Sequence, residues 1–233
     1  MADTQTTSFV LTKPEVGASR DVWGPKLNTN FDRIDDAMLG FYTAGGTGNA
    51  ITITTGMSLT SVPTGMKIRF RVGSANTGAT TINVDGIGAQ TAVTVTGVAL
   101  PNGYTRTGVD TVATWDGSNW TVDRQPERGG TIGTGGLYTK LADGSLFQIK
   151  TGSVPNTNTA IGSSFRSAAQ TWTFSVPFVS ASQYIVTGAG DLGASFISYG
   201  GAISASAYDF FVISPITFAS TVNYVARAEG FWY

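Results

Sequence analysis

The feature that most constrains the fold is the strict alternation of apolar and basic side chains in KIRFRV, residues 67–72. Successive side chains of a β-strand point to opposite faces, so this pattern predicts a half-buried strand. Turns containing Asp85-Gly86 and Asp116-Gly117 separate further short runs of β-formers. We predict a small all-β domain over residues 43–125. Its other expected strands are TTINV (80–84), TAVTV (91–95), TVATW (111–115) and NWTV (119–122).

A second β region follows a glycine-rich stretch. Residues 126–136 contain Pro126 and five glycines, which predicts a linker. Residues 137–233 then form a β-sandwich-like C-terminal domain, in which Pro177 marks the edge or the end of its strand. The expected strands of this domain are LFQIK (146–150), WTFSVPF (172–178), QYIVT (183–187), ASFIS (194–198), YDFFVIS (208–214) and VNYVARA (222–228).

Residues 1–42 carry a polar arm and the one convincing helix. The helix should start between Ser19 and Pro25, with Ser19 or Asp21 as N-cap, and stop at Gly40. Apolar residues recur inside it at spacings of four, three and four, the pattern of an a/d seam. A helix this short is marginal alone, so it either packs on its own domain or bundles with copies of itself. The seam, with the tryptophan that precedes it, comprises Trp23, Leu27, Phe31, Ile34 and Met38.

Composition narrows the function. Charged residues make up 12% of the chain, about half the usual share, while 30 residues are Gly. This balance suits short strands and burial against copies of the same chain. The absence of Cys and His excludes Ser-His-Asp and Cys-His catalysis and His-ligated metals, so no metal or cofactor is expected. The net charge of −1 gives no reason to expect nucleic-acid binding. No signal-peptide core and no apolar run of about 18 residues is visible.

Two motifs look functional and are better explained otherwise. Gly188-x-Gly190-x-x-Gly193 follows a predicted strand, but a dinucleotide site also needs a helix there, and ASFISYGGAIS predicts none. We interpret this motif as a loop. The basic row of KIRFRV, which comprises Lys67, Arg69 and Arg71, is interpreted as the solvated face of its strand.

Several motifs, taken in order, resemble bacteriophage tail-fibre and receptor-binding fibre proteins. TKPEVGASRDVWGPKLNTNFDRID (12–35) is similar to their N-terminal virion-anchoring segment, and TWDGSNW (114–120) to hairpins of their shafts. LYTKLADGSLFQIK (137–150) resembles the opening of a fibre tip domain. Such domains continue with an aromatic strand ending in Pro-Phe, here TFSVPF (173–178), and end with Ala-x-Gly-x-Trp, here Ala228, Gly230 and Trp232.

The resemblance implies a mainly-β homotrimer in the virion, made in the bacterial cytoplasm. Residues 1–42 would anchor it to phage tail or baseplate proteins, or to the capsid. The tip, residues 137–233, would adsorb to a host glycan or outer-membrane receptor without enzymatic activity. A glycan-cleaving depolymerase and a structural decoration fibre without a receptor are the alternatives. A depolymerase would need two carboxylates in one cleft, and the tip offers Asp191 and Asp209.

Glycan recognition uses aromatic faces against sugar C–H groups and short polar side chains for hydroxyls. We therefore expect the receptor site among the aromatic and acidic residues of the tip. The candidates are Asp191, Tyr199, Tyr208, Asp209, Phe231, Trp232 and Tyr233.

Overall fold

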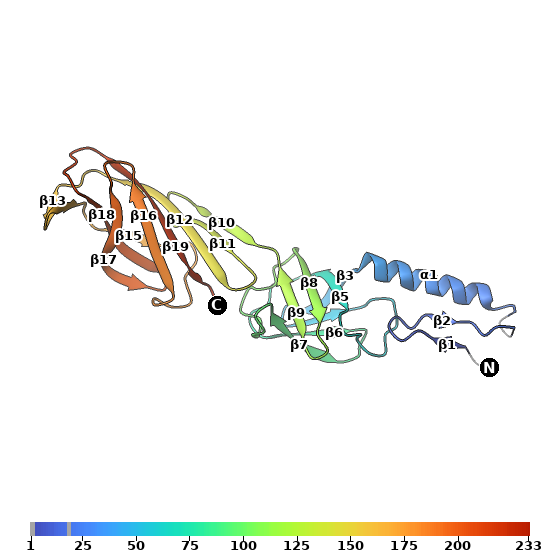
Figure 1. The fold of residues 1–233 in the computed structure, drawn as a ribbon. Helices are drawn as coiled ribbons and strands as arrows, with labels where there is room; N and C mark the ends of the chain where they lie inside the picture. The colour runs from blue at the N-terminus through green and yellow to red at the C-terminus, as the bar shows by residue number, and fades with distance from the viewer. Residues whose placement is uncertain (1–2, 18–19) are drawn as a thin grey trace. The chain divides into compact units, whose positions relative to one another are not determined.

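The computed structural model describes residues 3–17 and 20–233 (Figure 1). The chain divides into two compact units, Met1–Gln125 and Pro126–Tyr233. Strands account for 47% of the chain and helix for 7%, so the predicted mainly-β class is confirmed.

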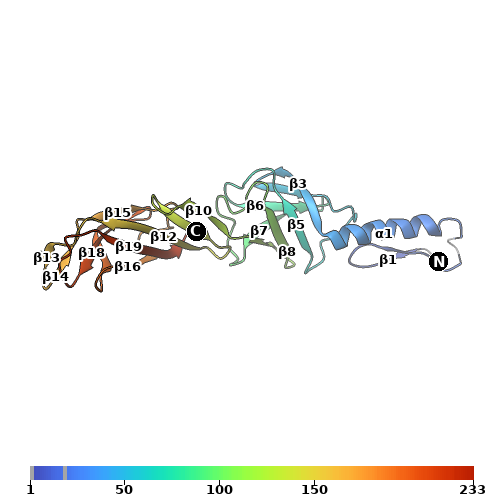
Figure 2. The ribbon, with the colours of Figure 1, turned by 90° about the horizontal axis from the view of Figure 1, so that it is seen from above.

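The first unit begins with a small hairpin beside the helix. Strands β1 (Thr4–Gln5) and β2 (Thr12–Lys13) pair antiparallel, and the arm that they form lies along α1 (Trp23–Leu39) in both views (Figures 1 and 2). The Asn30 side chain accepts a hydrogen bond from the Thr12 amide at 2.8 Å and donates one to its carbonyl at 2.7 Å. Lys26 forms an ion pair with Asp3 at 2.6 Å. The arm therefore covers a polar face of the helix.

The helix ends as expected but begins differently. Its N-cap is Val22, which has no side-chain capping hydrogen bond, so the expected cap at Asp21 is wrong, and Ser19 lies outside the described residues. The first turn of the helix contains no acidic residue. At the other end Gly40 adopts a left-handed φ of 55°, and its amide donates to the Asp36 carbonyl at 3.1 Å. Glycine tolerates this conformation without steric cost, which explains the stop.

The rest of the first unit is a closed seven-stranded barrel in the order β3-β4-β6-β7-β9-β8-β5. Ile68 and Phe70 of β5 are fully buried and alternate with exposed basic residues, as the KIRFRV pattern predicts. The sequence did not reveal β3 and β4. The strands are β3 (Phe41–Thr47), β4 (Ala50–Ile53), β5 (Lys67–Arg71), β6 (Thr80–Val84), β7 (Ala89–Thr94), β8 (Asp110–Trp115) and β9 (Trp120–Arg124).

Both predicted turns join neighbouring strands of the barrel. Asp85 and Gly86 have φ of 49° and 74° between β6 and β7. Asp116 lies between β8 and β9, where its carboxylate accepts hydrogen bonds from the amides of Ser118 and Asn119 at 2.7 and 2.6 Å. These amide donors lower the pKa of Asp116, because they stabilise its ionised form. The Trp-Asp-Gly motif thus works as a hairpin turn.

The basic row is solvated, as interpreted. Lys67, Arg69 and Arg71 are exposed along β5. Arg71 forms an ion pair with Asp110. The guanidinium groups of Arg69 and Arg71 lie 5.3 and 5.5 Å from the centre of the Phe41 ring. These contacts with Asp110 and Phe41 therefore explain the positions of Arg69 and Arg71 without a ligand.

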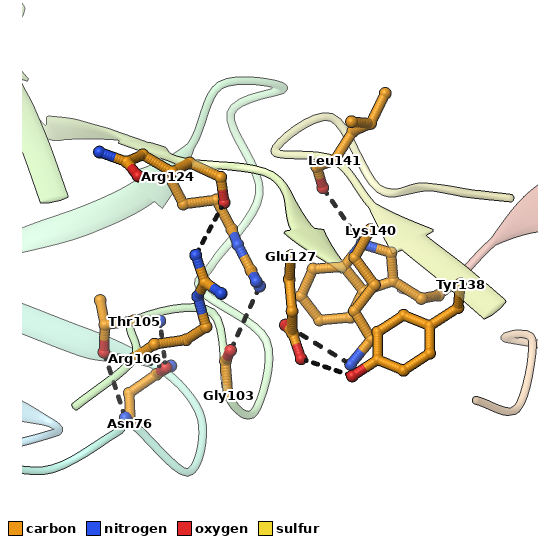
Figure 3. A network of polar contacts seen from close by, with 11 residues as sticks. Asn76, Gly103, Thr105, Arg106, Arg124, Glu127, Tyr138, Lys140 and Leu141 are labelled. Carbon is orange, nitrogen blue, oxygen red and sulfur yellow. Dashed lines mark hydrogen bonds and ion pairs between the residues drawn. The ribbon is translucent and has the colours of Figure 1, made fainter. Parts of the chain in front are cut away.

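Polar contacts also fix the loops at one end of the barrel (Figure 3). Buried Asn76 accepts a hydrogen bond from the Thr105 amide at 2.9 Å and donates to the carbonyls of Gly78 and Pro101. Arg124 donates to the Gly103 carbonyl at 3.3 Å. These contacts satisfy polar groups that would be costly to bury unpaired.

The second unit is one continuous ten-stranded sheet rather than two separate sheets. Its path runs β10-β11-β12-β19-β16-β17-β18-β14-β13, with β15 also paired to β18. Figure 1 shows β12, β19 and β16 side by side. The strands are β10 (Glu127–Thr131), β11 (Gly136–Lys140), β12 (Ser145–Val154), β13 (Thr159–Ile161), β14 (Ser164–Arg166), β15 (Gln170–Thr173), β16 (Tyr184–Gly190), β17 (Phe196–Ser204), β18 (Ala207–Ser214) and β19 (Val222–Phe231).

The expected linker at residues 126–136 is wrong. Most of this stretch is β10 and its hairpin turn into β11. A Cβ at Gly130 would lie 2.1 Å from the Gly136 carbonyl oxygen, and φ at Gly130 is +86°. The glycines thus allow two backbones to approach closely, and do not mark a flexible connection.

A core rich in aromatic residues lies inside this folded sheet. Trp172 is fully buried, and its indole N–H donates to the Gly135 carbonyl at 2.7 Å. Phe174 meets Trp172 and Phe178 edge-on at centroid distances of 5.0 and 4.9 Å. Strand β15 stops at Thr173, so the predicted strand over residues 172–178 is wrong beyond its first two residues, and Pro177 lies in the loop four residues past the strand end. The core contains Leu146, Val154, Trp172, Phe174, Phe178, Phe210, Val212, Val222, Tyr224, Ala226 and Ala228.

The strand register gives the second unit two distinct ends. At one end Glu127 of β10 pairs with Lys140, and Tyr184 of β16 pairs with Gly230. At the opposite end β12 and β19 pair through Val154 and Val222. The chain therefore enters this unit at the end where β19 finishes. The turn between β16 and β17 lies at the other end.

Candidate functional site

The predicted receptor residues do not form one site. They lie in three places in the second unit: the end of β19, a tyrosine cluster, and the turn after β16. The three groups are Phe231, Trp232 and Tyr233; Tyr199, Tyr208 and Asp209; and Asp191.

The C-terminal aromatic pair has a structural role. The Trp232 indole N–H donates to the Leu141 carbonyl at 3.2 Å, and the Tyr233 hydroxyl donates to the Ala142 carbonyl. The two rings meet edge-on at 4.7 Å. Both residues thus close the β11–β12 turn, while Phe231 just before them is 48% exposed.

Charged and aromatic groups support the same end (Figure 3). The Tyr138 hydroxyl donates to the Glu127 carboxylate at 3.1 Å, and Lys140 lies 3.9 Å from the same carboxylate. The Lys140 ammonium also lies 4.9 Å from the Trp232 ring centre, within cation–π range. These side chains satisfy one another, so their arrangement explains local order without a ligand.

The tyrosine cluster contains one residue that sequence reasoning missed, Tyr184. Its ring lies 6.2 Å from that of Tyr208, which in turn lies 5.9 Å from that of Tyr199. The Tyr184 hydroxyl donates to the carbonyls of Ser204 and Ala207 at 3.0 and 3.2 Å. Burial, with the neighbouring phenols, raises the pKa of Tyr184 to about 12, and burial raises that of Tyr208. Both phenols therefore ionise at a higher pH than an exposed tyrosine.

The tip carboxylates Asp191 and Asp209 are far apart. Asp209 lies in β18, where it pairs with Thr171. Four residues further along β18, Ile213 pairs with Phe196 of β17, which pairs with Ala189 of β16. Asp191 lies two residues beyond Ala189 in the same direction. At about 3.3 Å per residue, this register separates the two acids by roughly 20 Å along the strands. Paired glycosidase carboxylates lie about 5–10 Å apart. Asp191 and Asp209 do not form such a pair.

Asp191 belongs to a different arrangement, with Asn223 at the start of β19. The Asp191 carboxylate accepts hydrogen bonds from the Asn223 amide at 2.9 Å and from its side-chain N–H at 2.6 Å. The Asp191 amide donates to the Asn223 carbonyl at 2.9 Å. The pair borders a shallow hollow of about 570 Å³ on the sheet surface. Its other lining residues are Thr151, Gly152, Ser153, Ala189, Gly190, Tyr224 and Val225.

Sequence reasoning missed Asn223, Thr151 and Ser153. Asn223 occupies an exposed position of an alternating strand, which only marks it as facing solvent. Its bond to Asp191 spans 32 residues, and only the strand order reveals it.

The glycine motif around residue 190 is followed by a strand and not by the helix that a dinucleotide site needs. Gly188 and Gly190 lie within β16, so the interpretation of the whole motif as a loop is only partly right. Gly193 lies in the turn, and strand β17 follows where a phosphate-binding helix would begin.

The apolar seam of the helix is exposed in the single chain. No residue of α1 is buried, and the exposed fractions of Trp23, Phe31 and Met38 are 56%, 59% and 82%. Ile34 is 39% exposed, and Leu27 is half-buried. Packing of the seam on the helix's own domain, one of the two expected arrangements, is therefore not observed. No helix of the described residues is long and apolar enough to cross a membrane.

Comparison with solved structures finds fragments of pyocin tail fibres. An N-truncated R1-type pyocin tail fibre matches 47% of this chain and 88% of its own, with 14% identity and a TM-score of 0.35. A C-terminal fragment of the P. aeruginosa R1 pyocin fibre matches 48% of this chain and 29% of its own, with 14% identity and a TM-score of 0.34. No protein-family model matches the sequence. No curated protein matches it either.

Proposed function

We propose that this chain is a fibre subunit of a phage virion that attaches to a bacterial surface glycan through its second unit, without cleaving it. One observation carries the proposal. The two motifs that resemble the opening and the close of a fibre tip, residues 137–150 and Ala228-x-Gly230-x-Trp232, fold into one hydrogen-bonded end. Strands β12 and β19 pair along their whole length between these motifs. A hydrogen bond between Trp232 and Leu141, 91 positions apart, thus joins the two motifs.

The first unit supports a role in assembly. The arm uses polar side chains of α1, which leaves the apolar seam free for other chains. Two heptads of seam are too short to associate strongly alone, so the helix would add to contacts made elsewhere in a homotrimer. We propose that the arm and helix bind the tail, baseplate or capsid proteins of the particle.

Adhesion fits an oligomer better than a monomer. Three weak sites per fibre raise the effective affinity by orders of magnitude when they bind one surface together. A depolymerase is the runner-up, and the roughly 20 Å between Asp191 and Asp209 along the strands disfavours it. A decoration fibre without a receptor is the third reading.

Cell binding and glycan release distinguish the three readings. The fluorescently labelled full chain should bind some strains of a bacterial panel, and purified surface polysaccharide from those strains should compete. Incubation with the same polysaccharide should release no reducing ends. Release of reducing ends would favour the depolymerase, and failure to bind any strain would favour the decoration fibre.

A further inference from the structure

Beside the Asp191–Asn223 pair, polar and apolar side chains lie in two adjacent rows across the sheet. Building on the proposed fibre function, we propose that this hollow binds one pyranose ring of a neutral surface glycan. Phe196, which lies beside the lining of the hollow as the register partner of Ala189, would stack on the sugar, and Asp191 and Asn223 would bind its hydroxyls.

The apolar row runs across four strands. Phe196 of β17 is the register partner of Ala189 in β16, and Ala189 is the partner of Val225 in β19. The row ends at the polar residue Thr151 of β12, which pairs with Val225. Partners in an antiparallel sheet present side chains on the same face, and this face is the exposed one of β19. The Phe196 ring is 48% exposed and stands beside the small side chain of Ala189. A flat apolar surface is thus open to a sugar ring.

The polar row lies two residues further along the strands. Asp191 bonds to Asn223, and Asn223 pairs with Ser153. Two residues of strand span roughly 7 Å and neighbouring strands lie about 5 Å apart, so the backbones of Phe196 and Asp191 are roughly 8 Å apart, while Asn223 lies one strand further away. A pyranose on Phe196 would therefore place hydroxyl groups at the polar row.

The carboxylate is already oriented for this task. Each Asp191 oxygen accepts one hydrogen bond from Asn223, which fixes the rotamer. A carboxylate has about four acceptor positions, so each oxygen can accept another donor. Fixing the group before binding reduces the conformational entropy lost on binding. Sugar hydroxyls are donors of the required kind.

Charge favours a neutral sugar over an acidic one. The residues that line the hollow, all within the described part of the chain, include the acid Asp191 and no Lys or Arg. An anionic sugar would be repelled by the carboxylate, and the cation on the same face of β19, Arg227, lies two residues beyond Val225 on the side away from Asn223. The hollow also lies at the opposite end of the unit from Glu127, where the chain enters.

Binding of the full chain to an array of purified bacterial lipopolysaccharides and capsular polysaccharides tests the inference. We expect binding to glycans rich in neutral hexoses, and a loss of at least tenfold for Asp191→Ala and for Phe196→Ala. Phe196→Tyr should retain binding because its ring still stacks. The matched controls are Phe147→Ala, an exposed ring 42% accessible on the same sheet, and Asp143→Ala, a turn carboxylate at the other end. Both controls should bind normally.

The outcomes separate the site from the function. Array binding that survives both Asp191→Ala and Phe196→Ala would overturn the hollow and leave the fibre function standing. A wild-type chain that binds cells but no arrayed glycan would overturn the glycan ligand. Failure to bind cells at all would count against the proposed function itself. Thermal unfolding shows whether the Asp191→Ala variant is folded. If that variant is unfolded, Phe196→Ala still tests the site, because the Phe196 ring is exposed.

Discussion

Trp232, the residue after the end of β19, donates its indole N–H to the backbone carbonyl of Leu141 at 3.2 Å. This hydrogen bond holds the turn between β11 and β12. The Trp232 amide also donates to the Gly144 carbonyl at 2.9 Å. Both ends of this turn are therefore fixed by one residue that is distant in sequence.

Trp232→Phe should lower the free energy of unfolding of the second unit by about 1 kcal/mol, because the Leu141 carbonyl loses the shorter of its two hydrogen bonds and keeps only the one from the Gly144 amide at 3.4 Å. Chemical denaturation followed by circular dichroism measures the change. Trp23→Phe is the matched control, since Trp23 is 56% exposed on the helix. Equal stability of both variants would mean that the indole bond contributes nothing.

Alkaline pH should destabilise the second unit through Tyr184. An unfolded Tyr ionises near pH 10, whereas burial and the nearby phenols raise the pKa of folded Tyr184 to about 12. Between these values the unfolded state has lost more protons, so the free energy of unfolding falls as pH rises from 10 to 12. Tyr184→Phe should make this fall shallower, and Tyr184→Phe with Tyr208→Phe shallower still. Denaturation midpoints at several pH values test it, and an unchanged slope would contradict it.

The exposed seam of α1 should contribute to assembly rather than to folding of the chain. The wild type should have about three times the 24.3 kDa chain mass in light scattering. Phe31→Asp with Ile34→Asp should lower that mass, because charges would enter an apolar contact between copies. The barrel should still melt normally, since both side chains are exposed.

A matched control for this variant adds the same charges away from the seam. Asn28→Asp with Thr29→Asp places two carboxylates on exposed positions of other helix faces. This control should keep the wild-type mass. A wild-type chain that is monomeric at micromolar concentration would contradict the proposed homotrimer.

Tyr199 and Tyr208 should respond differently to truncation. Tyr208 is half-buried between Tyr184 and Tyr199, so Tyr208→Ala should cost about 2 kcal/mol of folding stability. Tyr199 is 51% exposed, and Tyr199→Ala should cost less than about 1 kcal/mol. Parallel melting and cell-binding curves measure both effects. Lost binding by Tyr199→Ala with unchanged melting would move the receptor site to the tyrosine cluster.

Strands with regular alternation were predictable from sequence, and glycine-rich strands were not. The alternation of KIRFRV follows directly from one buried face, so β5 was found within a residue of its ends. Glycine in β3 and β10 serves close backbone approach. A Cβ at Gly46 would lie 2.1 Å from the Ala50 carbonyl oxygen. The same residues in sequence are typical of flexible segments, so residues 126–136 were taken for a linker.

The candidate site was less predictable than the fold, for a topological reason. Residue type drew attention to Asp191 as an acid of the tip, and its role in binding stays a prediction. Its partner Asn223 and the ring of Phe196 come from other strands, and only the order β19-β16-β17 brings them together. Trp232 and Tyr233 had suitable chemistry for sugars, yet their polar atoms bond to the β11–β12 turn. Residue type alone does not distinguish an aromatic residue that binds sugar from one that holds a turn.

The position of β19 also sets the order of events during synthesis. This strand is the last of its unit to leave the ribosome, yet it lies between β12 and β16 in the interior of the sheet. Strands β10 to β12 and β16 to β18 can form hairpins early, but they cannot join until β19 is available. Contacts this distant in sequence slow folding. A nascent chain that is cut short before Val222 would leave two open sheet edges, so only a chain translated through β19 can complete this unit.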